Sequence, residues 1–252
     1  MKLKKALGGL IICLIFFLSF WLIAQAADNN LDSDNDGLTD NQEINIYYTN
    51  ANYYDTDGDG YDDNIEIKNG YSSRHAGRGI KLIDVDSDND GLNDKWELII
   101  GTDILNSDTD GDSYSDGSEV ANGYDPLREK GVKADKIIKV NLAKQNLAYY
   151  FNNKLLESFP ISSGIASLPT PKGNFKILAK VPVKAYKGVG YYYPNTKWNL
   201  HFTTGWDKYY IHGAYWHNNF GRPMSHGCVN VPYDKMERLY EFSEVGTRIE
   251  IS

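Results

Sequence analysis

Apolar and polar residues alternate over much of the second half of the chain, which is the pattern of β-strands with one buried face. The pair Asn152-Asn153 separates two alternating stretches and marks a turn. The predicted strands span residues 138–142, 147–151, 155–159, 175–183, 208–212 and 249–251.

The apolar period becomes that of a helix after Pro232, and Gly246 is the expected end of this helix. Its apolar face consists of Met236, Leu239, Tyr240 and Phe242. Many short strands with one helix predict a mainly β fold for residues 136–252, either a sandwich or a barrel.

The N-terminus has no such alternation. Residues 6–24 form an uncharged apolar run behind Lys2, Lys4 and Lys5, and Ala24-Gln25-Ala26 has the small-x-small form of a cleavage site. The run is also long enough to span a bilayer, which takes roughly 20 residues. We therefore expect residues 1–27 to be a cleaved signal peptide or a retained anchor. Both alternatives place the rest of the chain outside the cytoplasm.

Between these parts lie four copies of one polar pattern, each with Asp at positions 1, 3, 5 and 9 and Glu at position 12. Position 6 is Gly in three copies and Ser113 in the fourth. The first two copies lie close together in the sequence, as do the last two, which suggests two pairs. The copies are DSDNDGLTDNQE (32–43), DTDGDGYDDNIE (55–66), DSDNDGLNDKWE (86–97) and DTDGDSYSDGSE (108–119).

This spacing suits a calcium ion, which takes six to eight oxygen ligands and is larger and less demanding in geometry than Mg²⁺. Carboxylates at positions 1, 3 and 5, a backbone carbonyl at position 7 and a closing Glu would surround the ion, and position 9 completes the candidate set. The candidate ligands are Asp32, Asp34, Asp36, Leu38, Asp40, Glu43, Asp55, Asp57, Asp59, Tyr61, Asp63, Glu66, Asp86, Asp88, Asp90, Leu92, Asp94, Glu97, Asp108, Asp110, Asp112, Tyr114, Asp116 and Glu119.

The repeats resemble the thrombospondin type 3-like and dockerin-like calcium loops of exported proteins, and residues 106–126 resemble the bacterial thrombospondin type 3-like form in particular. A solvated acidic linker is the alternative, but Gly and Glu in register favour calcium. We expect Ca²⁺ to have a structural role, with order in this region depending on it. The region then serves as a spacer or docks a cell-wall or protein partner.

Charge divides the chain in the same way. Residues 28–129 carry 26 Asp and Glu against 6 Lys and Arg, whereas residues 130–252 carry 8 against 17. Two such different halves predict two modules. We expect a calcium-binding region over 28–129, a linker over 130–135 and a β-rich domain over 136–252.

Only two cysteines occur, and Cys13 lies in the apolar N-terminal run, so Cys228 has no partner for an internal disulfide. It ends the run Ser225-His226-Gly227-Cys228. A reactive thiol needs a base or a positive neighbour, a group that orients the base, and backbone N–H groups facing a developing oxyanion. The segment 210–231 supplies all of these residue types.

The pattern H-G…S-H-G-C-V-N resembles the signature of the YkuD-type L,D-transpeptidases, and Thr170-Pro171-Lys172-Gly173-Asn174-Phe175 resembles a second motif of that family. The resemblance extends over residues 136–252 and implies a mainly β catalytic domain. It implies peptidoglycan stem peptides as substrates and no cofactor in catalysis. The implied reaction cross-links two stems through a cysteine acyl-enzyme and releases D-Ala.

The resemblance also implies roles for individual residues. Cys228 is the expected nucleophile and His212 the expected base, oriented by the carbonyl of Gly213. Ser225 and His226 line the site, and the N–H groups around Gly227 and Cys228 form the oxyanion hole. The expected substrate contacts are Asn230, Arg222, Trp216 and Tyr215.

Alternatives remain at this stage. His226 could be the base with His212 structural, and Cys228 with the histidines could hold zinc, although no common zinc spacing is present. Hydrolysis of the acyl-enzyme would make an L,D-carboxypeptidase, and loss of activity would leave a calcium-dependent wall-binding protein. No nucleic-acid partner is expected, and membrane contact is expected only through an uncleaved N-terminal segment.

Overall fold

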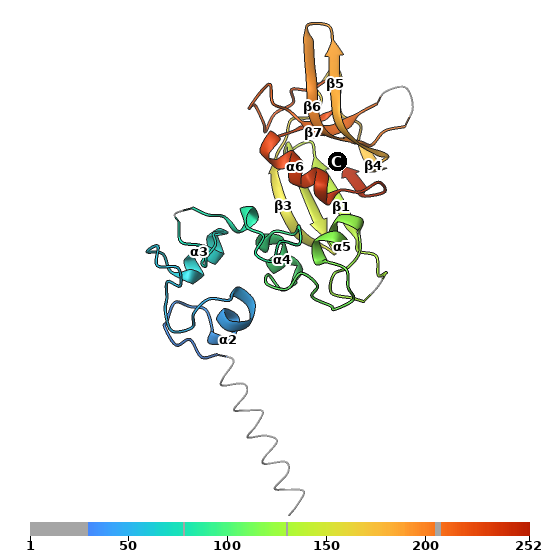
Figure 1. Cartoon of the computed structure of the whole chain (residues 1–252). Coiled ribbons are helices and arrows are strands. Elements are labelled where there is room, and N and C mark those ends of the chain that lie inside the picture. Colours follow the sequence, from blue (N-terminus) through green and yellow to red (C-terminus); the bar gives the residue numbers. More distant parts are fainter. Residues whose placement is uncertain (1–29, 78, 130, 205–207) are drawn as a thin grey trace, which may run out of the picture. The chain divides into compact units, whose positions relative to one another are not determined.

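Figure 1 shows the computed structural model, which describes residues 30–77, 79–129, 131–204 and 208–252. They form two compact units. The first comprises the described residues up to Ser87 with Asn93–Leu98 and Asp103–Leu105, and the second comprises Asp88–Leu92, Ile99–Thr102 and the described part of Asn106–Ser252. The predicted signal peptide or anchor lies outside the described residues. Within them, no helix has the length and apolar character needed to cross a membrane.

Each Asp-rich loop leads into a short helix that begins at position 9 of its repeat. The helices are α2 (Asp40–Gln42) with the π-helical turn η1 (Glu43–Tyr47), α3 (Asp63–Asn69), α4 (Asp94–Ile100) and α5 (Asp116–Asn122), and the 3₁₀ turn η2 (Leu82–Asp84) precedes the third repeat. Thr39 and Ser115 cap α2 and α5 with their side chains, and Gly70 and Gly123 end α3 and α5 in the left-handed conformation. The short helical repeats predicted from the sequence are therefore confirmed.

Hydrogen bonds pair the repeats as their spacing suggests. In the first unit, the backbone N–H of Asn64 donates to a carboxylate oxygen of Asp36 at 3.1 Å, and its side chain donates to the Asp36 carbonyl at 3.0 Å. In the second unit, the backbone N–H of Gly117 donates to Asp90 at 2.6 Å. In each pair, the position-5 Asp of the earlier repeat thus accepts a hydrogen bond from the helix of the later repeat.

The fourth repeat packs on the β-rich part of the second unit. The ammonium of Lys136 donates to the carbonyl of Val120 in α5 at 2.7 Å and lies 4.6 Å from the centre of the Phe242 ring. Lys136 is 4% exposed, and burial lowers its pKa to about 8. A lysine near a helix C-terminus satisfies carbonyl groups that have no partner within the helix.

A five-stranded sheet forms one half of the β-rich part. Its strands are β1 (Lys136–Asn141), β2 (Asn146–Phe151), β3 (Lys154–Pro160), β4 (Gly173–Lys176) and β9 (Arg248–Ile251). Their order is β3-β2-β1-β9-β4, and only the β1–β9 pair is parallel. The inward residues Ile138, Leu147 and Ile249 are fully buried.

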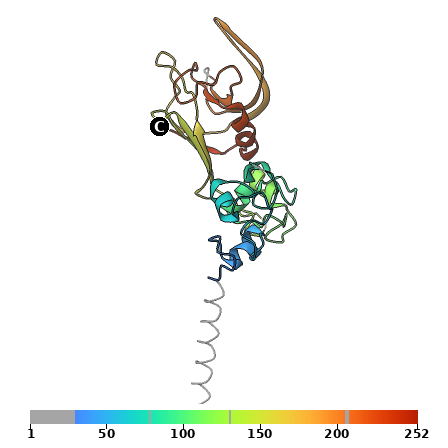
Figure 2. The same ribbon diagram turned by 90° about the vertical axis from the view of Figure 1, so that its left-hand side faces the viewer.

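A four-stranded sheet, ordered β5-β6-β7-β8, forms the other half. Its strands are β5 (Ala179–Gly188), β6 (Tyr191–His201), β7 (Tyr210–Gly213) and β8 (Val229–Val231). The β7–β8 pair is parallel and the others are antiparallel. The long β5–β6 hairpin extends beyond the other strands of this part in both views (Figures 1 and 2).

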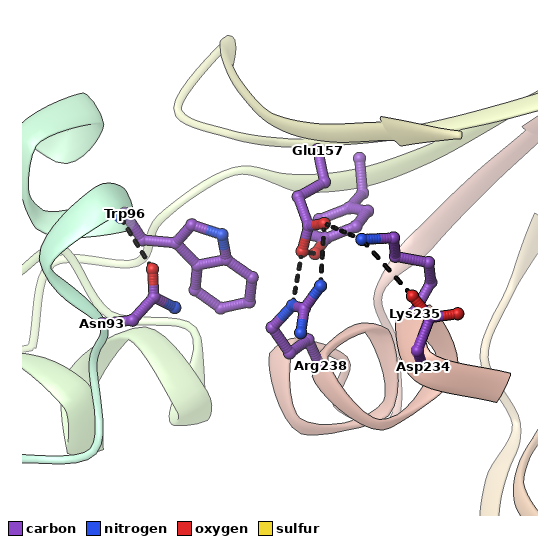
Figure 3. A network of polar contacts seen from close by, with 7 residues as sticks. Asn93, Trp96, Glu157, Asp234, Lys235 and Arg238 are labelled. Carbon is purple, nitrogen blue, oxygen red and sulfur yellow. Dashed lines mark hydrogen bonds and ion pairs between the residues drawn. The ribbon is translucent and has the colours of Figure 1, made fainter. Parts of the chain in front are cut away.

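Helix α6 (Tyr233–Phe242) contacts strands of both sheets and buries Met236, Leu239 and Phe242. Its Phe242 ring lies 4.9 Å from that of Tyr149 on β2. Glu157 on β3 accepts two hydrogen bonds from Arg238 of α6, at 2.9 and 3.2 Å, with Lys235 at 3.9 Å (Figure 3). A mainly β fold with one helix, as predicted, is confirmed.

Two boundaries differ from the sequence prediction. The stretch 175–183 is not one strand: the N–H of Ile177 bonds to Thr247 beside the first sheet, and the N–H of Leu178 bonds to His201 of the second. The chain changes sheets between these two residues. Helix α6 ends at Phe242 rather than near Gly246, because the Ser243 hydroxyl donates to the Leu239 carbonyl at 2.6 Å and the backbone turns extended there.

Candidate active site

Parallel pairing of β7 and β8 brings the two central residues of the motif together. His212 lies opposite Asn230 in the register, and Cys228 directly precedes β8. On its other edge, Asn230 exchanges two backbone hydrogen bonds with Ser162. His212 and Cys228 line one cavity of about 320 Å³, together with Ser225, His226, Trp216 and Asn230.

The orientation of His212 is fixed by its neighbour. Its Nδ1 lies 3.0 Å from the carbonyl oxygen of Gly213, which can only accept, so Nδ1 carries the proton and Nε2 is a free base. The ring stacks on Tyr186 at 4.4 Å. His212 is 2% exposed, and burial lowers its pKa to about 4. The imidazole is therefore neutral at physiological pH.

A side chain at position 213 would disturb this arrangement. A Cβ built on Gly213 would lie 2.5 Å from the ring of Tyr233, at the start of α6. Only glycine lets β7 approach the helix this closely. In the pair His212-Gly213, the first residue thus supplies the imidazole and the second allows the close contact between β7 and α6.

Cys228 lines the cavity as a protonated thiol. Burial raises its pKa to about 11, against smaller lowering effects from the backbone N–H of Tyr210 and the charge of Lys184. Both the thiol and His212 are therefore neutral before a substrate binds. A proton must pass from sulfur to a base as the sulfur attacks.

Hydrogen bonds hold the Ser225–Cys228 turn in shape. The Ser225 hydroxyl donates to the Cys228 carbonyl at 2.5 Å and accepts from the N–H of Gly227 at 3.2 Å. The hydroxyl of Thr170 donates to the same carbonyl at 3.5 Å and accepts from Gly164 at 2.9 Å. The first residue of the Thr170–Phe175 motif therefore supports the turn from outside.

Gly227 has a φ of +110°, and a Cβ there would lie 2.3 Å from the Tyr209 ring. Both the backbone angle and the contact require glycine. Its N–H donates to Ser225, which differs from the oxyanion-hole role expected for it. The N–H of Cys228 is the other donor that the sequence suggested at this turn.

Aromatic rings form a continuous wall along the cavity. His226 stacks on Tyr191 at 4.9 Å, Tyr191 on Tyr193 at 5.4 Å, and Tyr193 on Trp216 at 3.9 Å and 4°. The wall continues to His212, 5.7 Å from Trp216. His226 is exposed and belongs to this wall, whereas His212 is buried and has its Nε2 available. This geometry favours His212 over His226 as a base.

Asn230 is buried, and its side-chain amide lies 3.0 Å from Nε2 of His217. Nδ1 of His217 accepts from the N–H of Asn219 at 3.2 Å, so the proton of a neutral His217 is on Nε2. The atom of Asn230 at this contact is the amide nitrogen Nδ2, and a rotation of the amide by 180° would present its oxygen to the Nε2 proton. Through this contact, His217 holds a residue of the cavity wall.

Two of the predicted substrate contacts lie elsewhere. Arg222 is exposed, donates to the side chain of Asn219 at 2.6 Å and does not line the cavity. The hydroxyl of Tyr215 donates to the Pro194 carbonyl at 2.7 Å, and its ring is also outside the lining. Trp216 and Asn230 do line it.

Other residues of the cavity wall had no specific signal in the sequence. Tyr186 stacks on His212 and donates to Asn199 at 2.8 Å, and the amide of Asn199 donates to the carbonyls of Val181 and Thr196. Lys184, Lys187 and Lys208 also line the cavity. Residues 186–216 are rich in aromatic side chains, and part of the wall comes from this stretch.

The Asp-rich loops form four separate carboxylate clusters. In each, carboxylate oxygens of positions 1, 3 and 5 lie within 4.8 Å of one another. The clusters are Asp32, Asp34 and Asp36; Asp55, Asp57 and Asp59; Asp86, Asp88 and Asp90; and Asp108, Asp110 and Asp112. The position-5 carboxylate accepts the N–H of position 7 in every loop, at 2.6–3.2 Å.

The position-9 carboxylates have a different environment. Both oxygens of Asp40, Asp63, Asp94 and Asp116 accept hydrogen bonds from the backbone and hydroxyl of the Ser or Thr at position 2. Position 9 thus closes the loop, which differs from the ligand role that the spacing suggested.

Buried oxygen atoms test whether a cation suits these loops. In the first, second and fourth loops, one oxygen of the position-3 Asp and one of the position-12 Glu are buried without a hydrogen-bond partner. Burial, with the charges of nearby Asp residues, raises the pKa of Glu43, Glu66 and Glu119 to about 7. A divalent cation would coordinate such oxygens and offset the repulsion, so the donor set fits Ca²⁺.

Comparison with known protein families gives a match for each of the two parts of the chain. Residues 135–251 match the L,D-transpeptidase catalytic domain family (YkuD), and residues 32–50, 55–70, 86–106 and 108–129 match the bacterial TSP3 repeat.

Relatives were found among curated proteins and solved structures. "Putative L,D-transpeptidase YqjB" of Bacillus subtilis is 27% identical over 50% of this chain and 77% of its own length. "L,D-transpeptidase 1" of Mycobacterium tuberculosis is 27% identical over 53% of this chain and 57% of its own length. A solved "L,D-transpeptidase from Mycobacterium smegmatis" is 26% identical over 48% of this chain and 60% of that chain, with a TM-score of 0.44.

The two sequence matches lie next to each other along the chain without overlapping. This chain has a YkuD-type L,D-transpeptidase catalytic domain preceded by bacterial TSP3 repeats.

Proposed function

We propose that this protein is an exported L,D-transpeptidase that cross-links peptidoglycan stem peptides, with Cys228 as its nucleophile and His212 as its general base. One observation carries the proposal. A buried imidazole with a free Nε2, oriented by the Gly213 carbonyl, lines the same cavity as the only thiol of the described residues. This is the base-and-nucleophile arrangement of covalent acyl transfer.

The first step forms an acyl-enzyme. Sulfur of Cys228 attacks the carbonyl carbon of the third residue of a tetrapeptide stem as its proton passes to Nε2 of His212. The bond between this carbon and the nitrogen of the terminal D-Ala then breaks. His212 returns the proton to the leaving nitrogen, so that free D-Ala departs and a thioester remains on Cys228.

The second step transfers the acyl group. The side-chain amine of a second stem attacks the thioester and gives a proton to His212 as its nitrogen bonds to the carbonyl carbon. Sulfur leaves and takes the proton back. The products are a cross-linked dimer and the resting enzyme.

The other residues of the site support these steps. Ser225 and Thr170 hold the turn that presents the thiol, and the N–H of Cys228 stabilises the oxyanion. The stacked rings of His226, Tyr191, Tyr193 and Trp216 give an extended peptide a flat wall. The contact between Asn230 and His217 holds another part of the cavity wall.

We propose a structural role for Ca²⁺ in the four repeats, with Asp at positions 1, 3 and 5, the carbonyl at position 7 and Glu at position 12 as ligands. We assign residues 28–129 to the repeats, residues 130–135 to a linker and residues 136–252 to the catalytic domain. The wall substrate places the protein outside the cytoplasm, either secreted or held by its N-terminal segment.

Product analysis tests this function. The purified, calcium-loaded protein is incubated with a disaccharide-tetrapeptide, and the products are read by mass spectrometry. A dimer lacking one D-Ala, formed by the wild type and lost in Cys228→Ala, is the expected result. Tripeptide without dimer would instead make the protein an L,D-carboxypeptidase, and an unchanged substrate with the folded protein would favour a wall-binding role.

A further inference from the structure

Among the described residues that line the cavity with Cys228, the side chains that carry a full charge are lysines. Lys184 and Lys187 of β5 and Lys208, just before β7, all line it. Among the described residues of the lining, none is Asp or Glu. Within the described ranges, neither Lys184 nor Lys187 forms an ion pair, in contrast to Lys139 and Lys235.

The charge of Lys184 acts on the thiol: burial raises the pKa of Cys228, and the charge of Lys184 partly opposes this effect. The ammonium of Lys184 lies over the rings of Tyr186 and Tyr210, at 5.6 and 5.3 Å, and Tyr186 in turn stacks on His212. Burial lowers the pKa of His201, and the charges of Lys208 and Lys184 lower it further. The ammonium groups of Lys184, on β5, and Lys208, just before β7, therefore both act on the ring of His201.

Positive charges that converge in a half-enclosed cavity repel one another unless an anion joins them. The sequence suggested Arg222 as a substrate contact. Its guanidinium donates to Asn219 and lies outside the cavity lining. The three lysines are thus the cationic groups that an anionic substrate meets beside the thiol.

We propose that Lys184, Lys187 and Lys208 form a subsite for a carboxylate of the acyl-donor stem. This proposal rests on the proposed function and specifies its substrate: donors with a free carboxylate next to the scissile bond are preferred over amidated donors. Two carboxylates fit this chemistry, the side-chain carboxylate of a third-residue diamino acid and the terminal carboxylate of the fourth residue.

Kinetics with matched donors test the subsite. Three tetrapeptide donors are compared: one with both carboxylates free, one amidated at the third-residue side chain and one amidated at the terminus. For the wild type, one amidation is expected to raise KM about tenfold, as loss of a charge-assisted contact would. The position of the sensitive amide identifies the carboxylate that the lysines bind.

The variants Lys184→Gln and Lys187→Gln are expected to raise KM for the free donor and to narrow the gap between free and amidated donors. Lys197→Gln is the matched control, because Lys197 is exposed on β6 of the same hairpin and is outside the cavity lining. Lys187 is itself exposed, so its variant carries little risk of misfolding.

Equal KM values for all three donors, or a preference that persists in both lysine variants, would overturn the subsite while leaving the transpeptidase assignment intact. If no donor is turned over by the folded wild type, the proposed function itself fails. The two failures are therefore distinguishable.

Discussion

Nδ1 of His212 lies 3.0 Å from the carbonyl oxygen of Gly213, the next residue of the same strand. A carbonyl fixes the tautomer of the imidazole but brings no full negative charge to stabilise an imidazolium. Burial lowers the pKa of His212 to about 4, and the hydrogen bond to Gly213 offsets only part of this effect. The base is therefore ready to accept a proton but does not hold one at rest.

The first prediction concerns the pH dependence of thiol alkylation. With the pKa of Cys228 raised to about 11 by burial, the thiolate fraction at pH 7 is small and grows tenfold per pH unit up to that value. The alkylation rate by iodoacetamide should rise steadily from pH 6 to 10. A plateau that begins near pH 6 would reveal a resting thiolate–imidazolium pair and contradict the neutral pair.

The second prediction concerns the turn before the nucleophile. Gly227→Ala places a methyl group against Tyr209 at a backbone angle that disfavours it, so the acylation rate should fall at least about tenfold. Gly221→Ala is the control, since Gly221 has a similar φ of +94° but open space around its Cβ. Similar losses in both variants would show that backbone strain, not the Tyr209 contact, is responsible.

The third prediction concerns the fourth calcium loop. Ser113 adopts a φ of +79° where the other loops have glycine, so Ser113→Gly should remove about 0.5–1 kcal/mol of strain. Calorimetry should show about two- to fivefold tighter Ca²⁺ binding by this loop. The reverse change in the second loop, Gly60→Ser, should weaken binding there. Unchanged Ca²⁺ affinities in both variants would show that backbone strain at position 6 does not weaken Ca²⁺ binding.

The fourth prediction concerns the contact between β3 and α6. Although burial raises the pKa of Glu157, hydrogen bonds from Arg238 and Tyr149 and the charges of Arg238 and Lys235 bring it below its ordinary value (Figure 3). Glu157→Gln should lower the free energy of unfolding by about 2 kcal/mol in urea titrations at pH 7. The exposed pair Lys139–Glu250 offers a control, Glu250→Gln, expected to cost less than about 0.5 kcal/mol.

The sign of the pH effect follows from the lowered pKa of Glu157. Its contribution is fully present above the pKa of the unfolded chain and is lost as the pH falls through the lower folded value. The difference in stability between wild type and Glu157→Gln should therefore shrink at acidic pH. A constant difference down to pH 3 would exclude the ion pair as its source.

Local patterns made the fold predictable. Alternation revealed β1 to β3 and β9, because each of these strands buries one face in the first sheet. The predicted strand 175–183 includes the start of β5, but the rest of the β5–β6 hairpin lacks this signal, because side chains such as that of Tyr192 are exposed there. Strand β8 has only three residues, too few for a period to show.

The candidate site was predictable where chemistry and spacing coincide in one segment. His212, Gly213 and Ser225–Cys228 lie within a short stretch of the sequence, and the structure brings them to one cavity. Tyr186, Lys184 and Lys187 come from a distant strand, so only the tertiary structure places them at the cavity. Thr170 and Lys208 lie in segments that the sequence did single out, but their contacts with the turn and the cavity appear only in the structure. Arg222 is close to Cys228 in the sequence but lies outside the cavity lining, so closeness in the sequence alone did not predict its position.

The most direct test of the central claim is the mass of the intact protein after a single turnover. Wild-type protein mixed with a disaccharide-tetrapeptide and quenched in acid should gain the mass of the donor minus D-Ala, and proteolysis should locate this mass on the peptide that contains Cys228. Cys228→Ala should show no adduct. Cross-linked product without any adduct on Cys228, or an adduct that persists in the variant, would contradict the mechanism.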